Sequence, residues 1–399
     1  MPIETPFHER TFALCESLNY RDWSGYYTVS AYEAHHEHEY NAIRTAAALI
    51  DISPLFKYLV TGPDAARLVN RLITRNVDRM KVGRVYYTPW CDEHGHVIDD
   101  GTVARLDEQR FRWTAADPNL RWFTQNAAGL NVEIDDVSET TAALALQGPM
   151  SANVLRACAR ADIDGLKYFR VTNGEIAGAA VDISRTGYTG DLGYEIWMDT
   201  RDAVRVWDAL MAAGRGYDLK PAGMLALDVA RVEAGLLLID VDFNGSKKAM
   251  TAAQKYTPYQ MGLGRLVSTD KAPFIGQAAL ARERTEGARR MIVGLEVDWN
   301  DVEALYDQEG LAPVAPAAAS RLPVPVTRHG LQVGRATTTA WSPTLKRLIA
   351  LATLDRPHYT AGTEVRLEVT VEGVRRWARA TVVPTPFFDP ERKTVTPPA

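Results

Sequence analysis

The sequence has few cysteines and no long apolar run. Its three cysteines, Cys15, Cys91 and Cys158, are spread over 399 residues; an odd number at wide spacing favours reduced thiols over disulfides and offers no zinc-ligand pair. No apolar run approaches the roughly 18 residues of a minimal membrane span. The first residues, MPIETPFHER, lack the basic and apolar segments of a signal peptide. We therefore expect a cytoplasmic protein with no membrane partner.

A strong charge of one sign is also absent. The chain carries 45 Lys and Arg against 50 Asp and Glu, a formal net charge of −5, and the two signs are mixed along the sequence. Nucleic acid is not an expected partner, because its binding needs a basic face. The 46% of hydrophobic residues is ordinary for a globular protein. A chain of this length predicts two or three domains, or one large domain with an appendage.

A strand, a Gly-Pro pair and a helix follow one another twice in the first half of the chain. Residues 55–60 predict a strand, and after Gly62-Pro63 the apolar residues from Ala65 onward predict a helix. Residues 143–158 repeat this order around Gly148-Pro149. Because Gly-Pro is a common turn signal, duplication and coincidence both stay open.

The pattern of predicted secondary structure changes near residue 285. Further helices predicted over 202–213 and 222–235 indicate an α+β body up to that point. Beyond it, short strands separated by Gly and Pro turns predict a small all-β domain: 291–297, 324–339, 348–354, 363–369 and 377–383. The Pro/Ala-rich segment 311–323 interrupts these strands, and we expect it to be a mobile loop with no chemical role.

The stretch SRTGYTGDLGYE, residues 184–195, combines glycines and tyrosines with a terminal glutamate. Its glycines could serve only turns that need a positive φ. The same residues would also suit a ligand, because tyrosine faces can cover a planar ring and the Glu195 carboxylate can accept parallel N–H bonds from an amino-pyrimidine edge. The glycine spacing matches neither phosphate-binding signature.

Two other clusters of polar residues are candidates for chemistry. Residues 86–100, YYTPWCDEHGHVIDD, place aromatic residues before a strand that ends at Asp99 and Asp100. Neighbouring residues on a strand point to opposite faces, so one carboxylate can enter a pocket and the other is expected to be solvated; turn formation is the alternative role. The His and Glu residues at 35–39 predict a solvated helix face, because their spacing is not that of a metalloprotease helix.

Residues 184–195 resemble the S-R-T-G-Y-T-G-E-D-G-F-E signature of the tetrahydrofolate-dependent aminomethyltransferases of the glycine cleavage system, the T-proteins, and of related folate-dependent demethylases. Other motifs of this family follow in order from about residue 40 to the end of the chain. They are R-x-x-x-G-x-F-D-V-S at 44–53, V-x-G-P-D-A at 60–65, G-G-x-I-D-D at 95–100, A-x-Q-G-P at 145–149, R-L-E-A-G-L at 231–236 and G-x-x-T-S-G-x-x-S-P-T-L at 334–345.

This resemblance implies a three-part α+β fold around a central hole. A body of two ferredoxin-like lobes, residues 1–285, would hold tetrahydrofolate, and residues 286–399 would form a β-barrel domain. The resemblance implies Asp100 as the catalytic acid beside the reacting folate nitrogens. It further implies a set of folate-binding residues: Tyr87, Tyr188, Glu195, Arg231 and Asp117. For Arg231 a structural ion pair is an equally good explanation.

The sequence departs from the T-proteins at three points. Pro54-Leu55-Phe56 stands where they have H-M-G, Leu227 where they have a helix arginine, and Thr114 where they have an asparagine. These changes remove polar groups associated with aminomethyl transfer. At residues 81–89, KVGRVYYTP, and 115–117, AAD, the chain is similar instead to dimethylsulfoniopropionate demethylase, a member of the superfamily.

The sequence thus predicts a tetrahydrofolate-dependent methyltransferase that demethylates a small methylated donor. Tyr86, Trp90 and Trp113 are expected to form aromatic walls around a sulfonium or ammonium donor, with core packing as their alternative role. Two other functions stay open. One is an aminomethyltransferase of glycine cleavage, whose partner would be a lipoyl carrier protein. The other is a non-catalytic folate-binding protein, against which the presence of Asp100 and Glu195 argues.

Overall fold

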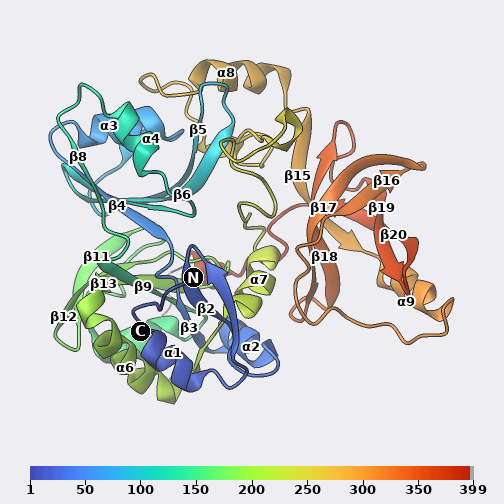
Figure 1. The fold of residues 1–399 in the computed structure, drawn as a ribbon, viewed down its shortest axis with the longest axis horizontal. Helices are drawn as coiled ribbons and strands as arrows, with labels where there is room; N and C mark the ends of the chain where they lie inside the picture. The colour runs from blue at the N-terminus through green and yellow to red at the C-terminus, as the bar shows by residue number, and fades with distance from the viewer. Residues whose placement is uncertain (396–399) are drawn as a thin grey trace.

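The computed structural model describes residues 1–395, which form two large β-sheets with covering helices, a two-stranded hairpin and a separate β-barrel (Figure 1). The first sheet has five antiparallel strands in the order β5-β6-β7-β4-β8. These are β4 (Phe56–Thr61), β5 (Val85–Cys91), β6 (Val97–Asp107), β7 (Arg110–Ala115) and β8 (Glu133–Asp136). Helices α3 (Ala65–Leu72) and α4 (Leu120–Asn126) pack their apolar side chains onto this sheet.

The second sheet has seven strands in the order β10-β11-β12-β13-β9-β3-β14, of which only the β14–β3 pair is parallel. They are β3 (Ala47–Asp51), β9 (Thr141–Gln147), β10 (Ala159–Arg160), β11 (Val171–Ile176), β12 (Ala179–Ser184), β13 (Gly193–Asp199) and β14 (Leu219–Pro221). Its two faces are covered by two pairs of helices: α5 (Ser151–Cys158) with α6 (Ala203–Gly214), and α2 (Glu37–Thr45) with α7 (Met224–Glu233).

The two strand–Gly-Pro–helix modules have the same structure. The strand order β5-β6-β7-β4 of the first sheet reappears as β11-β12-β13-β9 in the second. Gly62 and Gly148 both follow the first strand of their module with a positive φ, +117° and +118°. A Cβ would lie 2.7 Å from the carbonyl oxygen of Asn131 at Gly62 and 2.6 Å from that of Ala46 at Gly148. Only glycine fits either position, which favours duplication over coincidence.

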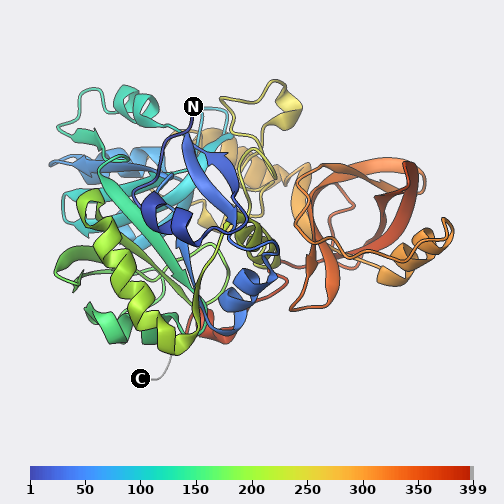
Figure 2. The ribbon, with the colours of Figure 1, turned by 60° about the horizontal axis from the view of Figure 1, so that its bottom comes forward.

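The C-terminal strands close into a six-stranded barrel in the order β15-β18-β17-β16-β19-β20, seen as a ring in Figure 2. They are β15 (Arg290–Val297), β16 (Val324–Arg328), β17 (Leu331–Ser342), β18 (Arg347–Asp355), β19 (Glu364–Val371) and β20 (Val374–Val383). The α+β class and the C-terminal barrel are therefore confirmed. Helix α9 (Trp299–Asp307) was not predicted; it begins after Asp298, whose carboxylate accepts a hydrogen bond from Asn300 N at 3.0 Å.

Several short elements frame these three parts. They are α1 (His8–Leu14), the hairpin β1 (Asn19–Trp23) and β2 (Tyr26–Ala31), and α8 (Gln277–Glu286). Helix α7 contacts α2 and β2 on the body and β17 and β18 on the barrel, and Figure 1 shows it between the two. Within residues 1–395, no helix is long and apolar enough to cross a membrane.

The chain after β20 returns from the barrel to the body. Phe387 N and Phe388 N donate to the carbonyl oxygen of Glu233, each at 2.9 Å. Arg392 then binds the buried Asp191 carboxylate at 2.6 and 2.8 Å, and Arg44 reaches the same carboxylate at 3.4 Å. We propose a domain boundary near residue 285, as the sequence predicts, with the residues after β20 belonging in space to the body.

Candidate functional site

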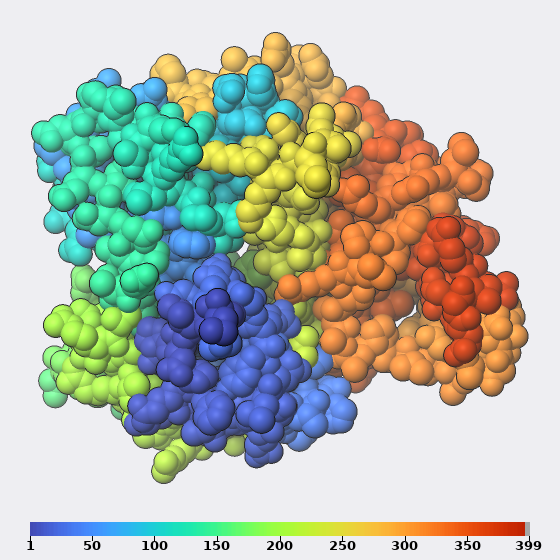
Figure 3. All heavy atoms as spheres, in the orientation of Figure 1, coloured from blue at the N-terminus to red at the C-terminus, as the bar shows by residue number. Residues whose placement is uncertain are grey.

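A cavity of about 340 Å³ lies between the two sheets. Its walls come from β5, β6 and β7 of the first sheet, from β9, β13 and the loop before β13 in the second, and from α7. Hairpin β1–β2 and the loop after α9 also contribute, through Trp23 and Arg321. Figure 3 shows the surface hollowed near the centre of the molecule, beside the N-terminal segment drawn in blue. The volume falls within the range of small-molecule pockets.

Asp100 on β6 projects into this cavity beside Tyr87 on β5. The Tyr87 hydroxyl donates to Oδ2 of Asp100 at 2.5 Å. Burial raises the pKa of the Asp100 carboxyl to about 6, although the Tyr87 hydrogen bond lowers it. A carboxyl with this pKa is ionised over much of the neutral range and can still take up a proton.

Asp99 lies on the opposite face of β6, and the expectation that it is solvated was wrong. Its side chain is fully buried. Its Oδ2 accepts from Asp117 N and Asn119 Nδ2, each at 3.0 Å, and its Oδ1 accepts from Asp100 N at 2.7 Å. Burial, followed by the neighbouring Asp100, raises the pKa of Asp99 well above its ordinary value. Asp99 therefore fixes the turn after β7 against the strand that carries Asp100.

The glycines of residues 184–195 allow the loop to pack tightly around Gln147. A Cβ on Gly187 would lie 2.0 Å from Gln147 Oε1, and a Cβ on Gly193 would lie 2.2 Å from the same atom. Thr189 Oγ1 donates to Gln147 Oε1 at 2.8 Å. The loop is thus held against the end of β9, where it forms one wall of the cavity.

Glu195 and Tyr188 line this wall. Glu195 Oε2 accepts from Thr186 Oγ1 at 2.7 Å. Burial raises the pKa of Glu195, while Thr186 and the nearby Arg112 lower it. The Tyr188 hydroxyl donates to the carbonyl oxygen of Leu237, which holds its ring at the cavity. The structure thus brings Tyr87, Asp100, Tyr188 and Glu195 to one cavity.

The three aromatic residues expected around a donor do not line this cavity. Trp90 and Trp113 are fully buried in the core between the first sheet and its helices. Their ring centroids lie 5.1 Å apart, and Trp113 also packs on Phe123 at 4.3 Å. Tyr86 is 6% exposed, and the Arg75 guanidinium lies 3.7 Å from its ring centroid. Their side chains point away from the cavity because neighbouring strand residues alternate between faces, and this position favours core packing, their alternative role.

Arg231 and Asp117 also lie outside the cavity wall. Arg231 is fully buried, with Nη1 bound to Oδ2 of Asp242 at 2.5 Å and Nη2 to Oγ1 of Thr338 at 3.0 Å. Its ion pair with Asp242 therefore has a structural explanation, and its hydrogen bond to Thr338 on β17 joins α7 to the barrel. Asp117 Oδ1 accepts from Lys248 Nζ at 2.6 Å.

Sequence reasoning missed a charged cluster at another part of the wall. Arg21 on β1, Asp228 on α7 and Arg321 in the loop after α9 all line the cavity. Arg321 Nη2 binds the Asp228 carboxylate at 2.6 and 2.7 Å. The Pro/Ala-rich segment 311–323, which we expected to have no chemical role, thus places one charged side chain at the cavity. A lone arginine at the end of a Pro/Ala run gives no periodic signal that could have identified it.

The three departures from the T-protein motifs all reach the cavity. Leu55, Thr114 and Leu227 line it, from the segment before β4, from β7 and from α7 respectively. Leu227 is 5% exposed and Thr114 is 6% exposed. The substitutions therefore alter the lining of the cavity and not a distant surface.

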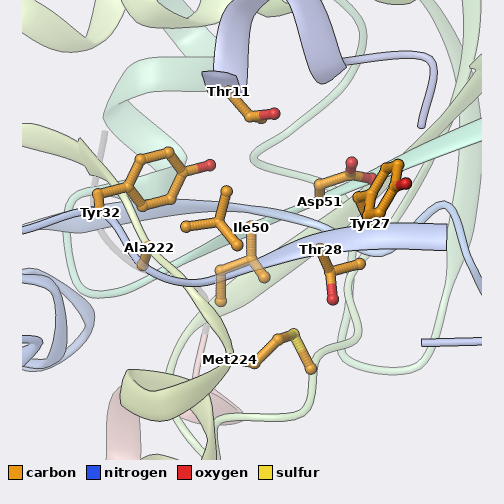
Figure 4. A pocket seen from close by; sticks show the side chains of 9 residues that line it. Thr11, Tyr27, Thr28, Tyr32, Ile50, Asp51, Ala222 and Met224 are labelled. Carbon is orange, nitrogen blue, oxygen red and sulfur yellow. The ribbon is translucent and has the colours of Figure 1, made fainter. Parts of the chain in front are cut away.

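A second cleft lies beside α1, but it holds only about 10 Å³. Figure 4 shows Thr11, Tyr32 and Asp51 among the side chains around it. This volume has room for about one water molecule, so the cleft is too small for an organic ligand. Residues 1–395 contain no cluster of three or more His, Cys, Asp and Glu side chains arranged to hold a metal ion.

Comparison with known proteins gives two family matches that together cover most of the chain. Residues 8–271 match the GCVT N-terminal domain, and residues 290–389 match the glycine cleavage T-protein C-terminal barrel domain. The fold is similar to that of the glycine cleavage system aminomethyltransferase T from Bartonella henselae, with a TM-score of 0.81 at 23% identity over 98% of this chain and 99% of that one.

Curated relatives of similar identity carry two different activities. An aminomethyltransferase of Moorella thermoacetica is 35% identical over 89% of this chain and 90% of its own length. An aminomethyltransferase of Streptomyces coelicolor is 36% identical over 86% of this chain and 87% of its own length. A trimethylamine-oxide aldolase of Ruegeria pomeroyi is 34% identical over 98% of this chain. The chain spans only 48% of the length of that aldolase.

Proposed function

This chain belongs to the glycine cleavage T-protein family, and from that premise we propose that it is a tetrahydrofolate-dependent methyltransferase. Its donor would be a small methylated compound, from which it removes one methyl group. The observation that carries this proposal is the position of Leu55, Thr114 and Leu227 in the cavity wall. Apolar or small side chains there favour a methylated head group over the polar aminomethyl group.

The cavity residues fit tetrahydrofolate. Glu195 lines the cavity, and Thr186 Oγ1 donates to its Oε2 at 2.7 Å. A carboxylate in such a site needs further N–H donors, and the amino-pyrimidine edge of a pterin supplies them. Tyr87 and Tyr188 offer aromatic surface in the same wall.

The reaction would be a displacement at the methyl carbon. Bound tetrahydrofolate supplies the nucleophilic nitrogen that takes up the methyl group. The bond from that carbon to the sulfur or nitrogen of the donor breaks, and its electron pair stays with the leaving thioether or amine. Asp100, with a pKa of about 6, can accept the proton that the attacking nitrogen releases. Tyr87 orients the Asp100 carboxylate through its 2.5 Å hydrogen bond, and alignment of the reactants supplies much of the acceleration.

A second candidate is aminomethyl transfer from a lipoyl carrier protein. It is favoured by the relatives of 35% and 36% identity, which are aminomethyltransferases. The two candidates differ in their products. Methyl transfer gives 5-methyltetrahydrofolate, whereas aminomethyl transfer gives the methylene form with release of ammonia.

Product analysis distinguishes these candidates. The protein is incubated with tetrahydrofolate and a panel of methylated sulfonium, ammonium and aryl-ether compounds, with trimethylamine oxide included because of the Ruegeria relative. Mass spectrometry then follows 5-methyltetrahydrofolate, and Asp100→Asn serves as the inactive control. Formation of the methyl product supports the proposal. Methylene product and ammonia from an aminomethyl-lipoyl carrier, with no methyl product from any donor, would establish the second candidate instead.

A further inference from the structure

Two arginines from distant parts of the chain meet on one carboxylate in the cavity wall. Arg21 Nη1 lies 3.3 Å from Oδ2 of Asp228, and Arg321 Nη2 lies 2.6 Å from the same oxygen. The Asp228 side chain is 6% exposed, whereas those of Arg21 and Arg321 are 23% and 36% exposed. The carboxylate thus lies beneath the two guanidinium groups, which retain surface toward the cavity.

Positive charge exceeds negative charge in this cluster. Arg231 Nε also lies 3.8 Å from Asp228, and Arg231 binds Asp242 at 2.5 Å. Three guanidinium groups therefore share two carboxylates, and one positive charge is left over. Burial lowers the pKa of Arg21, and the nearby Arg321 charge lowers it further against the effect of Asp228. Both groups stay protonated, because arginine does not deprotonate in proteins.

The position of Arg321 is fixed by the barrel. The preceding residue, Ser320, forms a two-way backbone bridge with Thr339 on β17: Ser320 N donates to Thr339 O at 2.7 Å and Thr339 N donates to Ser320 O at 3.0 Å. Arg21 is held by a hydrogen bond from its Nε to Ser30 Oγ at 3.1 Å. Guanidinium groups held in this way lose little freedom when they bind a ligand.

The surroundings of the two arginines are largely apolar. Trp23, Leu55, Met224 and Leu227 line the same cavity and pack against one hydrophobic cluster. Asp22 on β1 also lines the cavity, and its Oδ1 accepts from Gly25 N at 2.9 Å. Asp22 is exposed, so water screens its charge. A negative group placed on Arg21 and Arg321 would therefore lie in a partly desolvated site, where it could accept charge-assisted hydrogen bonds from both guanidinium groups.

We infer that Arg21 and Arg321 form a subsite for a carboxylate of a bound ligand. This inference rests on the function proposed above, because that function supplies two ligands that could bring a carboxylate. One is a zwitterionic donor, with a methylated cation at one end and a carboxylate at the other. The second is the glutamate tail of tetrahydrofolate. The chemistry recognised is the same, and titration with matched ligands separates the two sources.

The test uses isothermal titration of ligand pairs that differ only in the carboxylate. The donor pairs are 3-(dimethylsulfonio)propanoate with its primary amide and glycine betaine with its primary amide, titrated without folate. The folate pair is tetrahydrofolate with its derivative in which both glutamate carboxylates are amides. We expect the unmodified protein to prefer the carboxylate member of one kind of pair by about tenfold or more, as charged hydrogen bonds imply. The pair that shows the preference identifies the source.

Variants at the two arginines separate recognition from folding. Arg321→Gln and Arg21→Gln should each reduce the preference to about threefold or less, with the affinity for the amide nearly unchanged, and Arg321→Lys should retain part of it. Arg347→Gln, which removes an exposed ion pair with Glu296 on the barrel, is the matched control. Thermal melting verifies that each variant folds.

The outcomes for the subsite and for the proposed function are distinct. If neither kind of pair shows a carboxylate preference, or if the preference survives both glutamine variants, the subsite does not exist. If the donor pairs show an Arg321-dependent preference while tetrahydrofolate fails to bind, the subsite is supported and the proposed folate chemistry is wrong.

Discussion

The hydroxyl of Tyr87 donates to the carboxylate of Asp100 across the antiparallel pair β5–β6, at 2.5 Å. Tyr87 pairs in register with Thr102 and Asp100 with Pro89, so the two side chains are diagonal neighbours on one face of the sheet. Burial and this one hydrogen bond act on the acidity of Asp100 in opposite directions. Removal of the hydroxyl should therefore change the proton affinity of Asp100 in a known direction.

Tyr87→Phe should move the acidic limb of the pH profile to higher pH. In the unmodified protein, turnover should rise as the pH passes through about 6, where Asp100 ionises. The Tyr87 hydrogen bond stabilises the ionised form, so its loss raises the pKa of Asp100. The profile of kcat against pH measures the shift. An unchanged limb would show that Asp100 does not control turnover.

Asp100→Asn should reduce turnover by about a hundredfold or more while tetrahydrofolate affinity stays within a few fold, as expected for a group that acts on the transition state. Equal losses in binding and turnover would make Asp100 a binding residue only.

The free energy of unfolding provides a second measurement on Asp100→Asn. The pKa of Asp100 is raised from 3.8 to about 6 in the folded protein. Its stabilising contribution to the free energy of unfolding is therefore fully present below pH 3.8 and is lost as the pH rises through about 6. Asn cannot ionise, so this part of the pH dependence should disappear in urea denaturation.

Glu195→Gln should weaken tetrahydrofolate binding by about 1–3 kcal/mol, because a charged acceptor in the cavity becomes partly a donor. Isothermal titration measures the change. Glu175→Gln is a control, because Glu175 pairs with Arg160 on the exposed strands β10 and β11. Equal affinities for the unmodified protein and Glu195→Gln would remove Glu195 from the folate site.

Leu227→Arg should leave tetrahydrofolate bound and inhibit methyl transfer. Leu227 is 5% exposed and immediately precedes Asp228, on which Arg21 and Arg321 already converge. A further guanidinium there would repel the cationic head of a donor and would cost several kcal/mol if desolvated without a partner. Leu227→Met conserves volume and should keep most of the activity. Faster methyl transfer by the arginine variant would contradict the proposed donor chemistry.

Gly148→Ala should destabilise the second sheet by about 2 kcal/mol or more, because alanine is strained at this positive φ. A Cβ would also lie 2.6 Å from the carbonyl oxygen of Ala46. Gly216→Ala is the control, since no atom lies within 4 Å of a Cβ there. Urea unfolding of both variants measures the difference, and equal stabilities would contradict the strain argument.

The elements that could be predicted from the sequence are those whose apolar residues recur at regular spacing or that end at a clear turn signal. The strand before Gly62, the helix over 222–235 and the barrel strands all follow apolar spacing that local physics determines, and each is present. The residue types at 86–100 and 184–195 made Asp100 and Glu195 candidates, and the motif resemblance, not periodicity, assigned their roles. Both lie in the cavity wall.

Side-chain direction and long-range pairing could not be read from the sequence. Trp90 and Trp113 were expected to line a pocket because aromatic residues suit a cation, but they lie in the core. Whether their face of the sheet is buried or borders the cavity depends on which helices cover it. Those helices come from other parts of the chain. Likewise, Arg321 meets Asp228 only because the barrel places its loop against α7, a contact that no local pattern encodes.

The pairing of Asp191 with both Arg44 and Arg392 has a consequence for the order of synthesis. The segment 184–195, which includes Tyr188 and Glu195, leaves the ribosome long before Arg392, by roughly tens of seconds at ordinary translation rates. During that interval Arg392 has not yet been synthesised, so of the two arginines only Arg44 can contact Asp191, at 3.4 Å. This part of the cavity wall therefore gains its ion pair with Arg392 only after residue 392 has been synthesised, and a chain truncated before that residue would lack the contact.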